Sequence, residues 1–208
     1  VAVGTIVGAL TVGKATPYLA QAVPWLSVSM VTMAASASAA LAALLVWRGY
    51  RDGPYAFPSR PFAWTRVGEV VRERPWRLAL GGYLGHMAEL YSFWTWIPAF
   101  LVASDAARAA RVGDAANARI AAVVGFGVIA VGGIGCVWGG VVADRIGRAR
   151  LVTWSMAISG SCAIAIGFAW AQSWWVLAPL ALVWGFFVIA DSAQFSVLVT
   201  ESVPAHTV

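Results

Sequence analysis

Long runs of apolar residues, separated by short polar segments, dominate the hydrophobic pattern of the chain. A helix needs about 20 such residues to cross the hydrocarbon core of a bilayer. Six runs reach that length, at residues 1–22, 25–47, 78–103, 120–143, 151–171 and 174–199. They are too long for the strands of a membrane barrel and lack the alternation that such strands show. The pattern therefore predicts an all-α polytopic membrane protein with six transmembrane helices.

The composition supports a membrane location and does not require nucleic-acid binding to explain the positive charge. Hydrophobic residues make up 61% of the chain, charged residues only 11%, and the mean hydropathy is +0.78. Such values lie well outside the averages for soluble domains. The net charge of +5 would suit a nucleic-acid binder, but ten of the fourteen Lys and Arg residues fall in two segments between apolar runs, at 48–77 and 144–150. We attribute the positive charge to membrane topology, because cytoplasmic loops concentrate Lys and Arg.

The positive charges predict one orientation. Residues 48–77 and 144–150 are expected in the cytoplasm, and the connection 104–119 is expected on the outer side, although it also holds three arginines.

The two cysteines, Cys136 and Cys162, lie in different apolar runs without the spacing of metal ligands. Neither a disulfide framework, nor a metal site, nor a cofactor is predicted. Gly135 and Gly139 are expected at a helix contact, because small residues let membrane helices approach closely.

A short motif between the fourth and fifth runs gives the most specific signal. The sequence there reads Gly139-Gly140-Val141-Val142-Ala143-Asp144-Arg145-Ile146-Gly147-Arg148-Ala149-Arg150. In this reading, Gly140 allows a neighbouring helix to approach the backbone and Gly147 permits the chain reversal. Asp144 accepts charge-assisted hydrogen bonds near a helix end, and Arg145 and Arg148 keep the turn in the cytoplasm.

The motif resembles the loop motif of the major facilitator superfamily, in which a glycine and small or apolar residues precede Asp-Arg-x-Gly-Arg. The resemblance implies a twelve-helix transporter with two pseudo-symmetric halves, and a loop that stabilises one conformation of the transport cycle. Ala149 departs from the basic residue usual at its position. Four runs precede the motif and a long basic segment divides them, so the six runs correspond to helices five to ten.

That correspondence divides the chain into three parts. Residues 1–47 would form the last two helices of the N-terminal half, residues 48–77 the cytoplasmic linker between the halves, and residues 78–208 the first four helices of the C-terminal half. Because the chain opens inside an apolar run, we expect it to be a piece of a longer transporter, with helices missing at both ends.

Ionisable residues inside the apolar runs are the candidate functional residues. An ionisable group at bilayer depth costs at least about 2.5–3.5 kcal/mol and therefore needs a partner, a wet cavity or a function. His86 and Glu89 share one helix face, as do Asp191 and Gln194. His86 and Asp191 both lie about 12 Å from the expected cytoplasmic helix ends at about 1.5 Å per residue, so they could face one another. Trp96 extends the face of His86 and Glu89.

Lys14 is a further ionisable residue in the first run, where it would lie in a cavity or extend toward the membrane surface. A static polar contact that only orders the helices is the structural alternative for every one of these groups.

The sequence favours secondary active transport of a small solute by alternating access, driven by a proton gradient, in the plasma membrane or the bacterial inner membrane. The expected partners are the solute, a proton and membrane lipid. A receptor or scaffold of the same fold, without transport, is one alternative. A membrane-embedded enzyme that uses His86, Glu89 and Asp191 is the other, although no zinc-protease or serine-nucleophile motif occurs.

Overall fold

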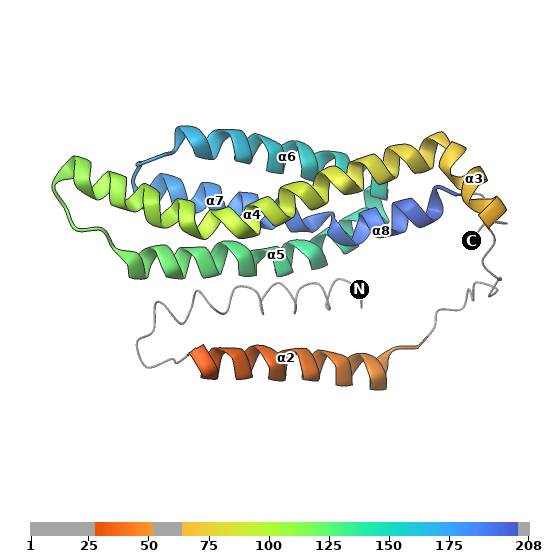
Figure 1. Cartoon of the computed structure of the whole chain (residues 1–208), viewed down its shortest axis with the longest axis horizontal. Coiled ribbons are helices and arrows are strands. Elements are labelled where there is room, and N and C mark those ends of the chain that lie inside the picture. Colours follow the sequence, from red (N-terminus) through yellow and green to blue (C-terminus); the bar gives the residue numbers. More distant parts are fainter. Residues whose placement is uncertain (1–27, 52–63, 204–208) are drawn as a thin grey trace.

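The computed structural model describes residues 28–51 and 64–203, and these ranges contain helices and no strand (Figure 1). The helices are α2 (Val28–Gly49), α3 (Trp64–Arg72), α4 (Arg74–Val112), α5 (Ala118–Ile146), α6 (Arg148–Phe168), α7 (Trp174–Ala190) and α8 (Ser192–Glu201). The all-α prediction is confirmed for the described part of the chain. The predicted helix at 1–22, including Lys14, lies outside the described residues.

Four spans are long and apolar enough to cross a membrane, by length and composition. They are Thr32–Gly49, Ala118–Ile146, Arg148–Phe168 and Trp174–Glu201. Helix α4 contains the predicted run 78–103 but is not among these spans. A long helix that is less apolar than its neighbours needs protein contacts along part of its surface.

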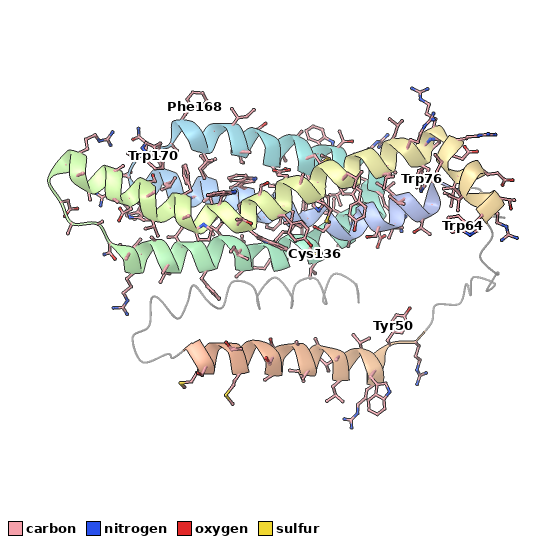
Figure 2. All side chains as sticks on the ribbon, in the orientation of Figure 1. Tyr50, Trp64, Trp76, Cys136, Phe168 and Trp170 are labelled. Carbon is pink, nitrogen blue, oxygen red and sulfur yellow. The ribbon has the colours of Figure 1, made fainter. Side chains whose placement is uncertain are left out.

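Helices α4 to α8 form one bundle, and α2 lies apart from it (Figure 1). Helix α7 packs against α5 and α6, while α4 packs against α5 and α8. The buried core joins all of these helices, with Phe93, Leu101, Val128 and Ile189 among its members. In contrast, large apolar side chains project from α2, and Trp47 is 78% exposed (Figure 2). The candidate site residues therefore all belong to the bundle of α4 to α8.

Glycines bring α5 and α7 into backbone contact. A Cβ atom at Gly139 would overlap the carbonyl of Ala190, and one at Gly135 would overlap the carbonyl of Phe186. On the facing helix, a Cβ at Gly185 would overlap the carbonyl of Val128. The expectation that Gly135 and Gly139 lie at a helix contact is thus confirmed. The close approach fixes α7 against α5 up to Ala190, the residue at which α7 ends.

The predicted helix at 174–199 is wrong in one respect, because the helix is interrupted at Asp191. Helix α7 ends at Ala190 and α8 begins at Ser192, and Asp191 itself is 2% exposed. The carbonyl of Asp191 then accepts hydrogen bonds from the backbone N–H groups of Gln194 and Phe195, at 2.9 and 3.1 Å. An Asp-Ser pair favours such an interruption, since both residues prefer helix starts to helix interiors.

Two connections are shorter than the sequence suggested. Helix α4 continues to Val112, so the connection predicted at 104–119 is reduced to residues 113–117. Gly113 ends α4 in the left-handed conformation, with φ of 69°. Between α5 and α6 only Gly147 is not helical, with φ of 89°. Gly147 therefore makes the chain reversal that the sequence assigned to it.

The α5 and α7 contact can be tested with adjacent glycines. Gly139→Ala should destabilise the bundle by about 1–3 kcal/mol, the usual cost of overpacking. Gly140→Ala is the matched control, because a Cβ there meets nothing within 4 Å and alanine is better than glycine in a helix by about 0.5–1 kcal/mol. Thermal unfolding followed by circular dichroism should give a lower midpoint for Gly139→Ala only. Equal midpoints for the two variants would contradict the close approach.

Candidate functional site

A buried polar cluster joins α4 to the interruption between α7 and α8. His86 Nδ1 lies 3.2 Å from Asp191 Oδ1, and His86 Nε2 lies 3.0 Å from the hydroxyl oxygen of Ser192. His86 and Asp191 are 1% and 2% exposed. The structure therefore brings together the two residues that the count along their helices placed at one level. We call His86, Asp191 and Ser192 the polar cluster.

The histidine has a different partner on each ring nitrogen. Asp191 Oδ1 is buried without a well-aligned hydrogen bond, so its 3.2 Å approach to Nδ1 is a close polar contact with imperfect hydrogen-bond geometry. A carboxylate beside Nδ1 favours the tautomer that carries its proton there. Nε2 of the neutral ring then accepts a hydrogen bond from Ser192, and an added proton on Nε2 would reverse that bond.

Aromatic packing holds the histidine in place. The ring of Phe195 from α8 lies against His86, with ring centroids 5.1 Å apart. Gly82, one turn before His86 on α4, provides room for that ring, because a Cβ atom at position 82 would lie 2.9 Å from Phe195 Cε1. The polar cluster is thus closed by an aromatic ring from the same helix that provides Ser192.

Glu89 has a different set of partners from His86, although the two share α4. The hydroxyl of Ser159 on α6 donates to Glu89 Oε2 at 3.1 Å, and the indole N–H of Trp184 on α7 donates to Oε1 at 3.0 Å. Both donors are neutral. Within the described part of the chain, no Lys, Arg or His forms an ion pair with Glu89. Among the described residues, Glu89 is therefore hydrogen-bonded without a neutralising charge.

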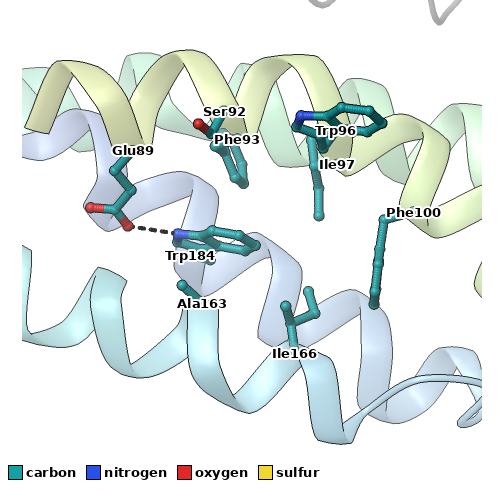
Figure 3. Close-up of a pocket in the computed structure, with 9 residues that line it drawn as sticks. All are labelled: Glu89, Ser92, Phe93, Trp96, Ile97, Phe100, Ala163, Ile166 and Trp184. Atoms are coloured by element: carbon teal, nitrogen blue, oxygen red, sulfur yellow. Dashed lines mark hydrogen bonds between the residues drawn. The ribbon is translucent and has the colours of Figure 1, made fainter.

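Glu89 lines a pocket between α4, α6 and α7, and its carboxylate accepts a hydrogen bond from Trp184, which lines the same pocket (Figure 3). The pocket has a volume of about 290 Å³ and is lined by Glu89, Ser92, Phe93, Trp96, Ile97, Phe100, Ala163, Ile166 and Trp184. Trp96, predicted from the helix face, is one of the lining residues and is 69% exposed. We call this cavity the Glu89 pocket. It is aromatic and aliphatic on nearly all sides, and Ser92 is its only other polar side chain.

The remaining predicted residue of this group is Gln194. It lies on α8, is 8% exposed, and follows Ser192 within the first turn of the helix. It does not line the Glu89 pocket. The polar cluster and the pocket are two separate sites, which share α4 but use different side chains.

The loop motif lies at the tight turn between α5 and α6. Among the described residues a Cβ atom at Gly140 would meet nothing within 4 Å, whereas Gly139 lies against the backbone of α7. Asp144 and Arg145 are exposed on the last turn of α5. No hydrogen bond or ion pair is recorded for the Asp144 side chain among residues 28–51 and 64–203.

Arg148 makes the one interhelical ion pair found within the described part of this motif. Its Nη1 lies 3.2 Å from Glu201 Oε1, which links the start of α6 to the end of α8. Both side chains are partly exposed, so the pair contributes about 0–1 kcal/mol to stability. It nevertheless connects the motif to the short helix that carries Ser192.

Polar contacts also join the helices at the opposite end of the bundle. Arg108 pairs with Asp105 at 3.0 Å and with Asp114 at 3.4 Å. The hydrogen bond to Asp105, with the charges of both carboxylates, raises the pKa of Arg108 above its ordinary value. Arg111 donates to the carbonyl of Ala171 in the turn between α6 and α7. Two of the three arginines in the predicted outer connection thus have structural partners.

Metal chemistry finds no support in the described residues, which contain no group of three or more His, Cys, Asp or Glu side chains able to hold an ion. Comparison with protein-family models, with curated proteins and with solved structures gave no match to this chain. The chemistry of the polar cluster and the Glu89 pocket must therefore be argued from their own geometry.

Ser192 was not predicted from sequence, and its role can be tested with a matched serine. Ser192→Ala leaves the buried His86 Nε2 without its partner, which should cost about 1–3 kcal/mol. Ser196→Ala removes an exposed hydroxyl one turn further along α8 and should change stability little. Thermal unfolding of the purified protein measures both effects. An unchanged midpoint for Ser192→Ala would show that its hydroxyl does not support the histidine.

Proposed function

We propose that this chain forms part of a proton-coupled secondary transporter of the major facilitator type, which moves a small solute across a cell membrane by alternating access. The observation that carries the proposal is the contact between His86 and Asp191 at the interruption between α7 and α8. The apolar spans and the sequence of the loop motif support it further.

Interrupted helices have a specific use in membrane transport. In apolar surroundings, backbone groups that leave a helix need partners or a wet cavity, so interruptions are tolerated where they serve a binding site. Asp191 lies at such an interruption, and the free N–H groups of the first turn of α8 favour a negative charge there. An interruption that also places a carboxylate 3.2 Å from a histidine is suited to holding a proton.

The proton would bind at Nε2 of His86. Histidine is the side chain that ordinarily gains and loses a proton between about pH 5 and 8. Uptake turns a neutral ring beside a carboxylate into an ion pair and turns the Ser192 hydroxyl from donor into acceptor. From α5, the thiol of Cys136 lies within electrostatic range of Asp191. Glu89, three residues along α4, is the other carboxylate on this part of the helix.

In this proposal residues 48–77 and 144–150 face the cytoplasm, and the turns at 113–117 and 169–173 face outward. The contacts of Arg108 and Arg111 reconcile the outer arginines with this orientation, because they are held by Asp105, Asp114 and the Ala171 carbonyl. Lipid would cover the exposed apolar surface of the helices, and the partners would be the solute and the proton. Neither nucleic acid nor a metal cofactor has a role.

A membrane-embedded enzyme is the alternative that a specific observation favours. Asp191, His86 and Ser192 are connected in the order of an acid, a base and a nucleophile. Ser192 is only 9% exposed, however, and does not line the Glu89 pocket. A hydrolase would consume its substrate and lose activity in Ser192→Ala. A transporter would deliver the solute unchanged.

Proton coupling can be measured in liposomes that contain the full-length protein and an internal pH-sensitive dye. A transported solute should drive a proton flux in the wild type, and Asp191→Asn should reduce it to background, because His86 loses its counter-charge. Asp114→Asn is the matched control, since it neutralises an exposed carboxylate at the end of α4. Solute uptake without proton movement, or equal fluxes in both variants, would contradict the assignment of the polar cluster.

Orientation can be tested with single cysteines in a variant that lacks Cys136 and Cys162. Ala115→Cys should react with a membrane-impermeant maleimide added to intact cells, because it lies in the outer turn. Ala149→Cys should react only after the membrane is opened, since the cluster of arginines at 145–150 holds it in the cytoplasm. Both positions are exposed in the structure. Labelling in the reverse order would contradict the proposed topology.

A further inference from the structure

We propose that the Glu89 pocket binds an organic cation, a ligand in which a positively charged nitrogen is attached to a compact apolar or aromatic body. The role of such a ligand as the transported solute rests on the proposed function. Its binding rests on the walls of the pocket alone.

The carboxylate of Glu89 supplies the first part of the argument. It is partly buried, and its two oxygens accept hydrogen bonds from Ser159 and Trp184 at 3.1 and 3.0 Å. These neutral donors orient the carboxylate and leave its charge without a counter-ion among the described residues. Each carboxylate oxygen can accept more than one hydrogen bond. A partly desolvated anion beside a pocket attracts a cationic ligand.

The aromatic walls supply the second part. Phe93, Trp96, Phe100 and Trp184 line the same cavity as Glu89, and the rings of Phe93 and Trp184 meet edge to face at 4.8 Å (Figure 3). The faces of aromatic rings attract cations, tryptophan most strongly. Trp184 has two roles, because its N–H orients the carboxylate and its ring forms part of the pocket wall. An aromatic cavity that also includes a carboxylate-bearing residue suits a substituted ammonium group, because the rings and the negative charge both attract a cation.

The same walls argue against other ligand classes. An anion would be repelled by Glu89, and a sugar needs several hydrogen-bonding groups, whereas Ser92 is the only other polar side chain of the pocket. The volume of about 290 Å³ lies at the lower end of the range of about 300–1,000 Å³ for ligand pockets. It suits a body the size of a single ring.

The site is separate from the polar cluster, although both depend on α4. His86 turns toward Asp191 and Ser192, and Glu89 turns toward Ser159 and Trp184. Replacing Glu89 by glutamine should therefore change cation binding while leaving the contact between His86 and Asp191 in place. This separation makes the two proposals testable one at a time.

Calorimetric titration of the full-length protein in lipid nanodiscs tests the proposal with three probes of similar shape. Benzyltrimethylammonium carries the charge, neopentylbenzene is its neutral isostere, and benzylsulfonate is an anion. Only the cation should give saturable binding. Glu89→Gln should weaken that binding by about tenfold or more, and Trp96→Leu should weaken it severalfold. Glu73→Gln, which neutralises a carboxylate at the start of the same helix, should bind like the wild type.

Binding of the neutral isostere as tightly as the cation, binding of the anion, or unchanged cation binding in Glu89→Gln would overturn the proposal. If the glutamine variant fails to fold, Glu89→Asp takes its place in the titration. Glu89→Asp should bind the cation more weakly than the wild type, and the double variant Glu89→Asp with Trp96→Leu should bind it more weakly still. Cation binding without a proton flux in liposomes would leave this site in place and reject proton-coupled transport. A proton flux driven by other solutes, without cation binding, would reject the cation site and leave proton-coupled transport in place.

Discussion

Burial of the Asp191 carboxylate in an apolar helical bundle is the constraint on which the rest of the arrangement depends. Such a charge is costly unless a partner neutralises it, and removing one member of a buried pair typically costs about 3–5 kcal/mol. His86 supplies the partner from α4, at 3.2 Å. The interruption between α7 and α8 brings Ser192 to the other side of the imidazole. The contact therefore fixes the position of α4 relative to both helices.

The helices on the two sides of this contact are held differently, α7 by close backbone packing and α8 by fewer contacts. Gly135 and Gly139 hold α5 against the backbone of α7 up to Ala190, and a tightly interlocked contact of this kind moves as one body. Helix α8 is short, and its far end is tied to α6 by the partly exposed pair of Arg148 and Glu201. A change of charge at His86 would act on the boundary between these two regions. We infer that this boundary is where proton binding would be converted into movement.

Much of the fold could be predicted from the sequence because apolar runs of helical length are an unambiguous signal. The described runs all became helices, and the count of residues along two of them placed His86 opposite Asp191. The extension of α4 to Val112 was missed because its polar end is rich in alanine and arginine, which are strong helix formers. The interruption at Asp191 was missed because hydropathy averages over the Asp-Ser pair that causes it.

The partners of Glu89 could not be predicted, since they come from contacts between distant helices. Ser159 lies among other small residues of α6, and nothing in its neighbourhood distinguishes it from Ser161, whose hydroxyl bonds to its own helix at Ala157. Gly140 and Gly139 are likewise equivalent in sequence, and only the packing of α7 separates them. Helix faces can be read from spacing, but the choice between adjacent positions requires the position of the neighbouring helix.

Alternating access driven by a proton is the central claim, and distances between spin labels on the two proposed halves test it most directly. One pair, at Ser29 and Ala115, would report on the outer ends of α2 and the bundle, and a second pair, at Gly49 and Ala149, on the inner ends. Lowering the pH should lengthen one distance while shortening the other, because in this proposal proton uptake by the polar cluster shifts the protein between two conformations. If both distances keep a single value at every pH, or move in the same direction, the account is contradicted.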